Sequence, residues 1–444
     1  MRGLITGIAL MFKTDTMKSI KHPKAEIINH GPNAITVQIE IPISSSMLET
    51  EELIQQGLNA AGTLTTGYVL SMHDTDGSPL IMGNEKFTSK GLTKKEYECP
   101  YGTAVVARHV YQSNKGGSTF CPLDQKARIQ RSSTPKFAKT VSWKYSNFAS
   151  GTVAEDLAEN HGRSISNKFI QDLGQHMATN IEAKSSVWHY DIPVDKKYVK
   201  SISASLDGTC LLMVEEGYRQ AMVGSISLYD KEGERLYTFY VASAPEYGKQ
   251  AFYEKLEVKI AEVKKLYPQA TWAGIADGAK DNWSFLTPHV NYEILDFYHV
   301  TEYLGKFADA TIKDVFQKKK WMEETCHKLK HDEKGAKKIL KEMKRKEPFK
   351  NRQDLKDDIS STITYFENHI DQMDYAKYQR ENLPIGSGII ESACKVIIKQ
   401  RLGNSGMKWK NEGAQAVMNL RCLSRSDTVW NQVWEKIDRY GFQN

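Results

Sequence analysis

The sequence predicts an α/β core that is interrupted by an all-helical insertion and preceded by an α+β region and a helix-turn-helix. With 444 residues, the chain is too long for one hydrophobic core, so several domains are expected. Between residues 200 and 299, β-branched and apolar runs are separated by a long amphipathic segment. From about residue 301 to 380, lysines stand among apolar residues at helical spacing.

The composition indicates a globular, mildly basic protein. Hydrophobic residues make up 40% of the chain, charged residues 26%, and the formal net charge is +6, which permits nucleic acid binding without establishing it. Six scattered cysteines favour a reducing cytoplasm over a disulfide scaffold. No apolar run could span a bilayer, and the apolar run in residues 1–12 lacks a small-residue cleavage site. We therefore expect a cytoplasmic protein without a membrane partner.

Residues 1–130 are predicted to form the α+β region. Alternating apolar and polar residues predict a strand within residues 26–45, and residues 46–61 predict a helix.

Two Cys-Pro pairs in this region have the layout of a zinc ribbon. Cys99 and Cys121 flank a strand-like run, and His109 and Asp124 are further candidate ligands. A zinc ribbon uses two CxxC pairs, and the second cysteine of each pair is missing here. We therefore favour a ribbon-like hairpin that no longer binds metal.

Residues 131–195 contain the helix-turn-helix candidate. Residues 152–160 and 167–176 predict two helices with a glycine-containing turn between them. In DNA-binding proteins of this kind, the second helix enters the major groove. Asn167, Lys168 and Gln171 are chemically suited to such contacts. An ordinary αα-hairpin accounts for the pattern equally well.

Residues 196–303 predict the first part of the core. The strands are expected at 200–213, 223–229, 234–243, 271–277 and 292–299, and the helices at 249–267 and 282–289. Three strands in a meander, then helix, strand, helix and strand, is the order of a ribonuclease H-like fold. In that topology the first and fourth strands are parallel neighbours at the centre of the sheet.

Two carboxylates mark these central strands. Asp207 interrupts the first strand, and Asp277 ends the fourth. A turn before Gly208 would explain Asp207 alone. If the strands are neighbours, however, the two carboxylates repel each other and need a cation or a shared proton. Hard oxygen ligands suit Mg²⁺ or Mn²⁺.

Residues 304–383 predict a helical insertion with a basic face, and residues 384–444 return to the core. Ser387 is a plausible N-cap, which would place Glu391 just past the first turn of a helix. Lys395 and Lys399 share its face at spacings of four. A glutamate at the start of a helix often does no more than interact favourably with the helix dipole. Glu391 becomes a candidate metal ligand only together with the two aspartates.

Four motifs within residues 195–425 together carry a family resemblance. They are Leu206-Asp207-Gly-Thr, Ala276-Asp277-Gly-Ala, Asp296-Phe-Tyr-His299, and Pro384-Ile-Gly-Ser-Gly-Ile-Ile-Glu391-Ser-Ala-Cys with Arg401-Leu-Gly-Asn-Ser-Gly-Met-Lys-Trp409. With these motifs the chain resembles the DDE/D transposases of bacterial insertion sequences, in the Kra/Lre-type groups related to Mutator-like elements. Its N-terminal half departs from the family pattern, because relatives often have a fuller zinc-binding region.

The resemblance implies a role for each motif. Asp207, Asp277 and Glu391 would be the catalytic, metal-binding triad that holds two Mg²⁺ or Mn²⁺ ions. Asp296 and His299 would act at the active site or the DNA end. The expected DNA-binding residues are Asn167, Lys168 and Gln171 of the helix-turn-helix candidate, Lys395 and Lys399 of the Glu391 helix, and Arg401 and Trp409 of the last motif, although Trp409 could instead pack against the core.

The implied activity is a DNA transposase. It would bind the ends of an insertion sequence, cleave them, join them to target DNA, and assemble on DNA in the nucleoid as a homodimer or higher oligomer. A ribonuclease H-like nuclease without strand transfer and a catalytically inactive DNA-binding protein derived from a transposase are the alternatives. Paired carboxylates also suit glycoside hydrolysis, but the basic charge and the strand order disfavour it.

Overall fold

The computed structural model of the 444-residue chain describes residues 22–246, 248–346, 353–426 and 428–442. The apolar run in residues 1–12 lies outside them. The chain forms two compact units, residues 1–141 with 150–173, and residues 142–149 with 174–444. The region of the helix-turn-helix candidate contributes to both units.

The first unit contains a hairpin, a long helix and a four-stranded sheet. Its elements before residue 130 are β1 (Lys24–His30), β2 (Ile35–Glu40), α1 (Met47–Met72), β3 (Leu80–Met82), β4 (Glu85–Glu98), β5 (Thr103–Ser113), β6 (Thr119–Phe120) and α2 (Pro122–Lys126). The single strand expected within residues 26–45 is in fact two antiparallel strands. A turn separates them, in which Gly31 N donates to the Ala34 carbonyl at 2.8 Å.

Helix α1 extends beyond the predicted end at residue 61, through a stretch rich in threonine and glycine. Such residues usually weaken a helix. Here Thr63, Thr65 and Thr66 each donate a hydroxyl hydrogen bond to the carbonyl four residues earlier. Gly62 allows close packing, because a Cβ at this position would lie 2.3 Å from Tyr101 Cγ.

The zinc-ribbon candidates lie around the β4–β5 hairpin. Cys99 and Cys121 are buried free cysteines. The other two candidates already have partners, since His109 Nδ1 lies 3.0 Å from Asp74 Oδ2 and Asp124 accepts a hydrogen bond from Lys95 Nζ at 3.0 Å.

Three helices follow: α3 (Pro135–Asn147), α4 (Ser150–His161) and α5 (Asn167–Ala183). The two helices of the predicted pair are therefore present as α4 and α5. Ser166 caps α5, because its Oγ accepts a hydrogen bond from Phe169 N at 3.2 Å.

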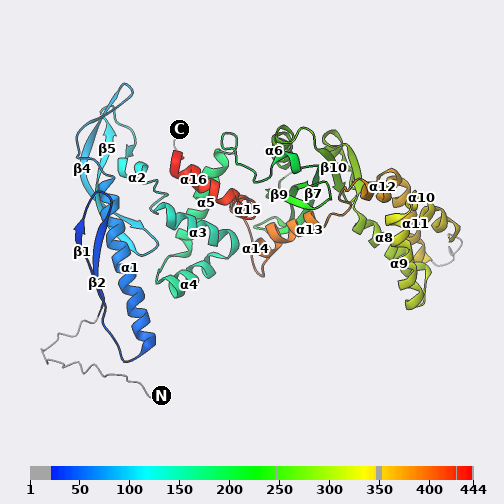
Figure 1. The fold of residues 1–444 in the computed structure, drawn as a ribbon, viewed down its shortest axis with the longest axis horizontal. Coiled ribbons are helices and arrows are strands. Elements are labelled where there is room, and N and C mark those ends of the chain that lie inside the picture. Colours follow the sequence, from blue (N-terminus) through cyan, green and yellow to red (C-terminus); the bar gives the residue numbers. More distant parts are fainter. Residues whose placement is uncertain (1–21, 247, 347–352, 427, 443–444) are drawn as a thin grey trace, which may run out of the picture. The chain divides into compact units, whose positions relative to one another are not determined.

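A five-stranded mixed sheet forms the centre of the second unit (Figure 1). The strands and the helices between them are β7 (Ser201–Met213), β8 (Gly217–Tyr229), β9 (Arg235–Ser243), α6 (Gln250–Leu266), β10 (Thr271–Ala276), α7 (Lys280–Leu286) and β11 (Tyr292–Leu295). The order in the sheet is β11-β10-β7-β8-β9. The first and fourth strands of the series, β7 and β10, are adjacent and parallel, as the sequence predicts.

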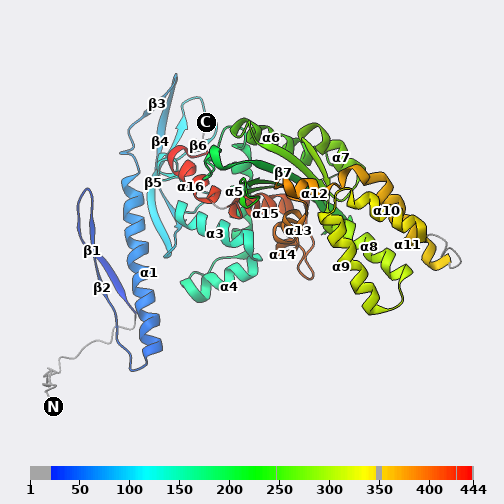
Figure 2. The ribbon, with the colours of Figure 1, turned by 45° about the vertical axis from the view of Figure 1, so that its right-hand side comes forward.

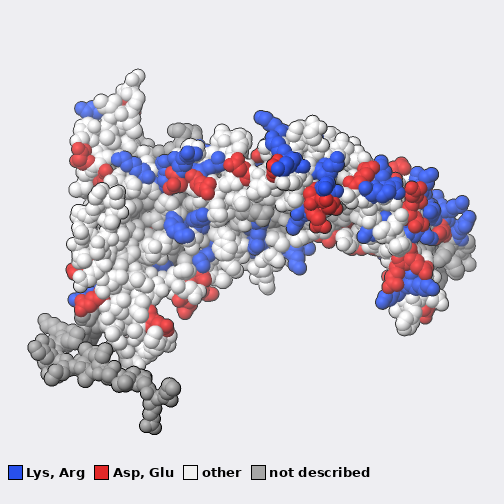
Figure 3. Space-filling model, in the orientation of Figure 1, with Lys and Arg blue, Asp and Glu red and all other residues white. Residues whose placement is uncertain are grey.

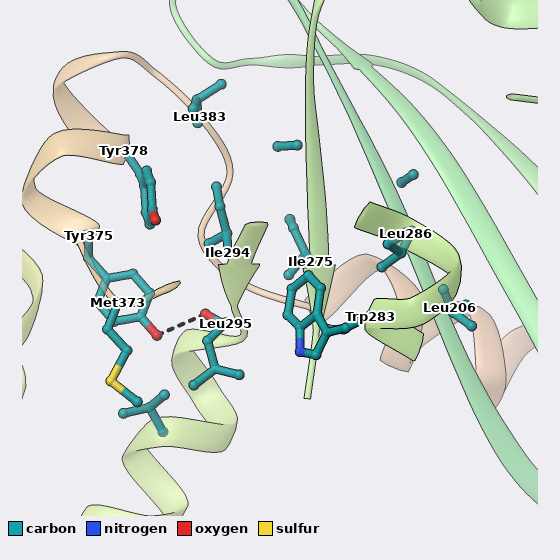
Figure 4. Close-up of a cluster of buried hydrophobic side chains, with 14 of the residues drawn as sticks. Leu206, Ile275, Trp283, Leu286, Ile294, Leu295, Met373, Tyr375, Tyr378 and Leu383 are labelled. Carbon is teal, nitrogen blue, oxygen red and sulfur yellow. Dashed lines mark hydrogen bonds between the residues drawn. The ribbon is translucent and has the colours of Figure 1, made fainter. Parts of the chain in front are cut away.

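One face of α6 packs on this sheet and explains its sequence period. Phe252, Leu256, Ile260 and Val263 recur every three or four residues and are all buried. They join a core that includes Leu206, Ile275 and Leu286 (Figure 4).

The fifth strand was predicted to run to residue 299, but β11 ends at Leu295. Asp296 is the N-cap of the next helix, α8 (Phe297–Thr311), and its carboxylate accepts hydrogen bonds from Tyr298 N at 3.3 Å and His299 N at 3.2 Å. A capping carboxylate favours the start of a helix, so the chain turns away from the sheet here.

The predicted insertion consists of α8 and four further α-helices (Figure 2). They are α9 (Val315–His331), α10 (Gly335–Lys346), α11 (Gln353–His369) and α12 (Tyr375–Arg380). Buried residues of these helices, such as Leu329, Ile339 and Phe366, belong to the same hydrophobic core as the sheet. These helices are therefore packed onto the sheet.

Lysines of the insertion are interspersed with acidic residues (Figure 3). Ion pairs join Lys318 to Asp309, Lys328 to Glu342, Lys338 to Asp332 and Lys344 to Glu367. The basic face expected from the sequence is therefore partly neutralised within the insertion itself.

The C-terminal part returns to the sheet as a series of helical segments. They are α13 (Gly388–Ala393), the π-helix η5 (Cys394–Lys399), α14 (Gln400–Leu402), α15 (Asn411–Ser424) and α16 (Val429–Tyr440). In the described part of the chain, no helix has the length and apolar character needed to cross a membrane.

The packing of α6 predicts a specific stability difference. Leu256 is fully buried, and its two Cδ atoms lie 3.0 Å from where a Cβ on Gly224 would stand. Leu256→Ala should lower the free energy of unfolding by about 2–5 kcal/mol, because it leaves a cavity. The matched Val258→Ala on the exposed face should change it by less than about 0.5 kcal/mol. Urea unfolding followed by tryptophan fluorescence measures both, and equal effects would contradict the assigned packing.

Candidate functional site

Asp207 lies where β7 leaves the core. The six residues before it, 201–206, are buried, whereas Asp207 is half-buried. Its Oδ1 accepts a hydrogen bond from Gly208 N at 2.6 Å, and its Oδ2 accepts one from Cys394 Sγ at 3.4 Å. The carboxylate is thus held at the sheet while remaining accessible from outside.

Asp277 directly follows β10 at the corresponding position. Ile275 pairs with Ser205 in the parallel ladder, and two residues further along both strands stand Asp277 and Asp207. Neighbouring strands are about 4.8 Å apart, so the register places the backbones of the two aspartates on neighbouring strands at the same level. The ligand atoms of Asp207, Asp277 and Glu391 do not, however, all lie within 4.8 Å of one another. Asp277 Oδ1 accepts hydrogen bonds from Ala279 N at 3.1 Å and Asn282 Nδ2 at 3.2 Å.

Glu391 lies in the first turn of α13. Ser387 occupies the N-cap position, as predicted, but its hydroxyl does not cap the helix backbone. Instead, Ser387 Oγ lies 2.7 Å from Glu391 Oε1 and 2.8 Å from Asp296 Oδ2. The hydroxyl lies between the two carboxylates and, having one proton, donates it to one of them at a time.

Asp207 and Glu391 line the same cleft, which has a volume of about 820 Å³. Lys395 and Lys399 also line it, as does Cys394. The cleft therefore combines two carboxylates with two exposed ammonium groups, a composition suited to binding a cation together with an anion.

The helix that carries these residues changes geometry at the cleft. After α13, residues 394–399 form a π-helix. Short π-helical segments cost stability and are frequent at functional sites. Cys394, which contacts Asp207, is the first residue of this segment.

Asp296 is a buried carboxylate beside this cluster. It is fully buried, and Ser387 N donates to its Oδ1 at 2.7 Å. Burial raises the pKa of the Asp296 carboxyl, but hydrogen bonds from His299 and Ser387 lower it more, so the pKa lies below its ordinary value. Asp296 is therefore ionised at neutral pH.

His299 is the cationic partner of Asp296. Its Nδ1 lies 3.3 Å from Asp296 Oδ2. That hydrogen bond raises the pKa of His299 to about 9; burial opposes the shift, and the charges of Asp296, Glu302 and Asp277 add to it. The imidazole is therefore protonated at neutral pH and offsets part of the negative charge around it.

Asp296, His299 and Glu391 could together hold a metal ion. One ligand atom from each lies within 4.8 Å of the others, and no other such group of three or more occurs among the residues that the structure describes. Asp296, however, already accepts hydrogen bonds through both oxygens. An ion bound here would have to replace some of these bonds and the proton on His299.

Two predicted DNA-binding residues are used inside the protein. Arg401 is 2% exposed, its Nε donates to the Tyr145 carbonyl at 3.1 Å, and its guanidinium lies 5.2 Å from the centres of the Tyr145 and Trp409 rings. A contact of Arg401 with DNA requires an exposed guanidinium, whereas the guanidinium of Arg401 is buried. Trp409 Nε1 donates to the Leu402 carbonyl at 2.9 Å, which agrees with packing rather than base stacking.

The other predicted DNA contacts are exposed. Asn167, Lys168 and Gln171 lie on the surface of the first turns of α5. Lys168 forms an ion pair with Asp172 at 2.9 Å, and Gln171 donates to Ser150 Oγ at 3.0 Å. Exposed pairs of this kind are weak, so both side chains could exchange them for a ligand.

Cys394, Ser387 and Tyr365 make contacts at the site that the sequence did not predict. Cys394 follows Glu391 by three residues, a spacing that places both on one helix face, so it could have been noticed. The hydroxyl link from Ser387 to Asp296 spans 91 residues, and the contact of Tyr365 with the Asp277 backbone spans 88. No local pattern reveals contacts at that separation.

No protein-family model and no curated protein matches this chain. The function is therefore inferred from its residues and their geometry.

The Asp296–His299 pair predicts a pH-dependent contribution to stability. Because the pKa of His299 is raised from 6.5 to about 9, its stabilising effect should be complete below about pH 6.5 and disappear as the pH rises through 9. The difference in urea midpoint between wild type and His299→Gln should therefore shrink from pH 6.5 to 9.5. His327→Gln, which removes an exposed imidazole from α9, is the control. A difference that stays constant across this range would contradict the assignment.

Proposed function

We propose that this protein is a DNA transposase of the DDE/D type, with Asp207, Asp277 and Glu391 as its metal-binding triad. One observation carries the proposal: Asp207 and Glu391, which are 184 residues apart in sequence, line one cleft with Lys395 and Lys399. Asp277 is not among the residues that line this cleft, and the parallel register of β7 and β10 supports its inclusion beside Asp207.

The strand order supports a ribonuclease H-like core. The sheet order β11-β10-β7-β8-β9, with β7 parallel to β10 and antiparallel to β8, is the arrangement expected for that fold. The helical insertion between β11 and α13 then separates the second aspartate from the glutamate, as the family resemblance implies.

The residues fit hard divalent cations. All three side chains of the triad offer carboxylate oxygens, which Mg²⁺ and Mn²⁺ prefer. Glu391 is exposed and Asp207 is half-buried, so both are accessible to solvent. When bound, two such ions would lower the pKa of the attacking hydroxyl and stabilise charge on the phosphate.

The reaction would proceed by two displacements at phosphorus. Water attacks a phosphodiester at the element end, the P–O3′ bond breaks, and the products are a 3′-hydroxyl and a 5′-phosphate. The 3′-hydroxyl then attacks a phosphodiester of target DNA, so one P–O bond forms as another breaks. Lys395 and Lys399 would neutralise the phosphates in the cleft, and Cys394 would keep Asp207 oriented by its hydrogen bond.

Recognition of the element ends is assigned to the pair α4 and α5. Asn167, Lys168 and Gln171 would contact DNA from the start of α5, the position from which a recognition helix reads the major groove. Since two ends must be brought together, we also propose a homodimer or higher oligomer on DNA.

A cleavage and strand-transfer assay tests this proposal. With Mg²⁺ or Mn²⁺ and duplex DNA from both sides of its coding sequence, the wild type should release a 3′-hydroxyl and join it to a target plasmid. Asp207→Asn, Asp277→Asn and Glu391→Gln should each lower cleavage about 100-fold or more, because each removes a charged ligand of the metal ions that would stabilise the transition state. The control Glu232→Gln, at an exposed turn outside the cleft, should cleave normally.

The other outcomes identify the alternatives. Cleavage without joining would favour a ribonuclease H-like nuclease, and binding without cleavage would favour an inactive DNA-binding protein. If the three substitutions leave cleavage intact while DNA binding is unchanged, the triad is wrong.

A further inference from the structure

The insertion is attached to the catalytic end of the sheet by tyrosine hydroxyls. Strand β11 is an edge strand, so its outward backbone carbonyls have no strand partner and need other donors. Tyr375 OH donates to the Leu295 carbonyl at 2.8 Å (Figure 4), and Tyr378 OH lies 3.3 Å from the Glu293 carbonyl. Both tyrosines belong to α12, so this helix covers the open edge of the sheet.

A third tyrosine makes the same kind of hydrogen bond to the backbone of Asp277, a member of the proposed metal-binding triad. Tyr365, in α11, donates its hydroxyl to the backbone carbonyl of Asp277 at 2.8 Å. Its ring is itself fixed, because it stacks on Tyr303 of α8 with a centroid distance of 3.9 Å and an angle of 10°. The first and fourth helices of the insertion therefore hold this hydroxyl in place.

The turn after Asp277 is pressed against the same helix. Gly278 has a φ of +102°, a conformation that favours glycine. A Cβ at this position would lie 3.0 Å from His369 Nε2 and 3.3 Å from Tyr365 Cε2. With its carbonyl bound by Tyr365 and its following turn confined by α11, the backbone of Asp277 has little freedom, and the backbone sets the direction of the carboxylate.

We propose that Tyr365 is a positioning residue for Asp277, through which the insertion orients this carboxylate for metal binding. The inference deepens the proposed function and rests on it for the identity of the ligand. It makes the insertion a structural part of the metal site. Tyr365 touches neither metal nor DNA in this account and acts only through the Asp277 backbone.

Tyr365→Phe tests the inference, because it removes the hydroxyl and keeps the ring that stacks on Tyr303. The matched control is Tyr267→Phe, which removes a hydroxyl that donates to the Val194 carbonyl at 3.1 Å elsewhere in the same unit. Titration of each protein with Mn²⁺ gives its dissociation constant. Hydrogen exchange of the amides in residues 278–281 reports directly on the turn.

Tyr365→Phe should weaken Mn²⁺ binding about fivefold, the effect of one net hydrogen bond, and speed exchange in the turn. In the cleavage assay, it should raise the Mg²⁺ concentration needed for half-maximal rate while leaving the rate at saturating Mg²⁺ near that of the wild type. Tyr267→Phe should change none of these quantities, although both substitutions can lower stability.

Equal Mn²⁺ affinity and equal exchange in Tyr365→Phe and wild type would overturn the inference while leaving the proposed function intact. If the wild type itself binds no Mn²⁺, the proposed function fails instead. Hydrogen exchange in residues 278–281 then still tests the role of Tyr365. Faster exchange in Tyr365→Phe than in wild type supports the stabilisation of the Asp277 turn by the Tyr365 hydroxyl, and unchanged exchange contradicts it.

Discussion

The parallel pairing of β7 with β10 is the constraint on which the rest of the site depends. In this register Asp207 and Asp277 each lie two residues beyond Ser205 and Ile275, the last pair of the parallel ladder, and no other strand separates them. In the proposed function a divalent cation would compensate these two charges, and the cleft beside Asp207 would admit it.

The compensation within the protein is incomplete. His299 supplies one positive charge, but its direct partner is Asp296. Lys395 and Lys399 line the cleft with Asp207 and Glu391, and no ion pair joins either lysine to a carboxylate among the described residues. The cleft therefore retains carboxylates that can bind a divalent cation and lysines that can bind phosphate.

Buried Asp296 joins the start of α8 to the segment that precedes α13. It begins α8 and accepts two hydrogen bonds from Ser387, just before the helix of Glu391. The chain enters and leaves the insertion at this point, and Phe297 N also donates to the Ile385 carbonyl at 3.0 Å. The helical segment between Asp296 and Ser387 thus leaves the sheet and returns to it at one hydrogen-bonded junction, which keeps Glu391 next to the sheet.

Local patterns in the sequence were sufficient for much of this architecture. The elements from β7 to α7 were predicted because their apolar periods are unmixed, and the pairing of β7 with β10 followed from their order. The end of β11 was not predicted correctly, because Phe297 and Tyr298 continue a strand-like run. Only the hydrogen bonds that Asp296 accepts as an N-cap reveal the start of the helix. The burial of Arg401 was also missed, since its aromatic neighbour Tyr145 lies 256 residues away in sequence.

Diffraction from crystals soaked in Mn²⁺, collected at the manganese absorption edge, tests the central claim most directly. An anomalous peak in contact with the carboxylates of Asp207 and Asp277 is expected, with Glu391 turned from Ser387 toward the ion. A peak bound only by Asp296, His299 and Glu391, or no peak at all, would contradict it.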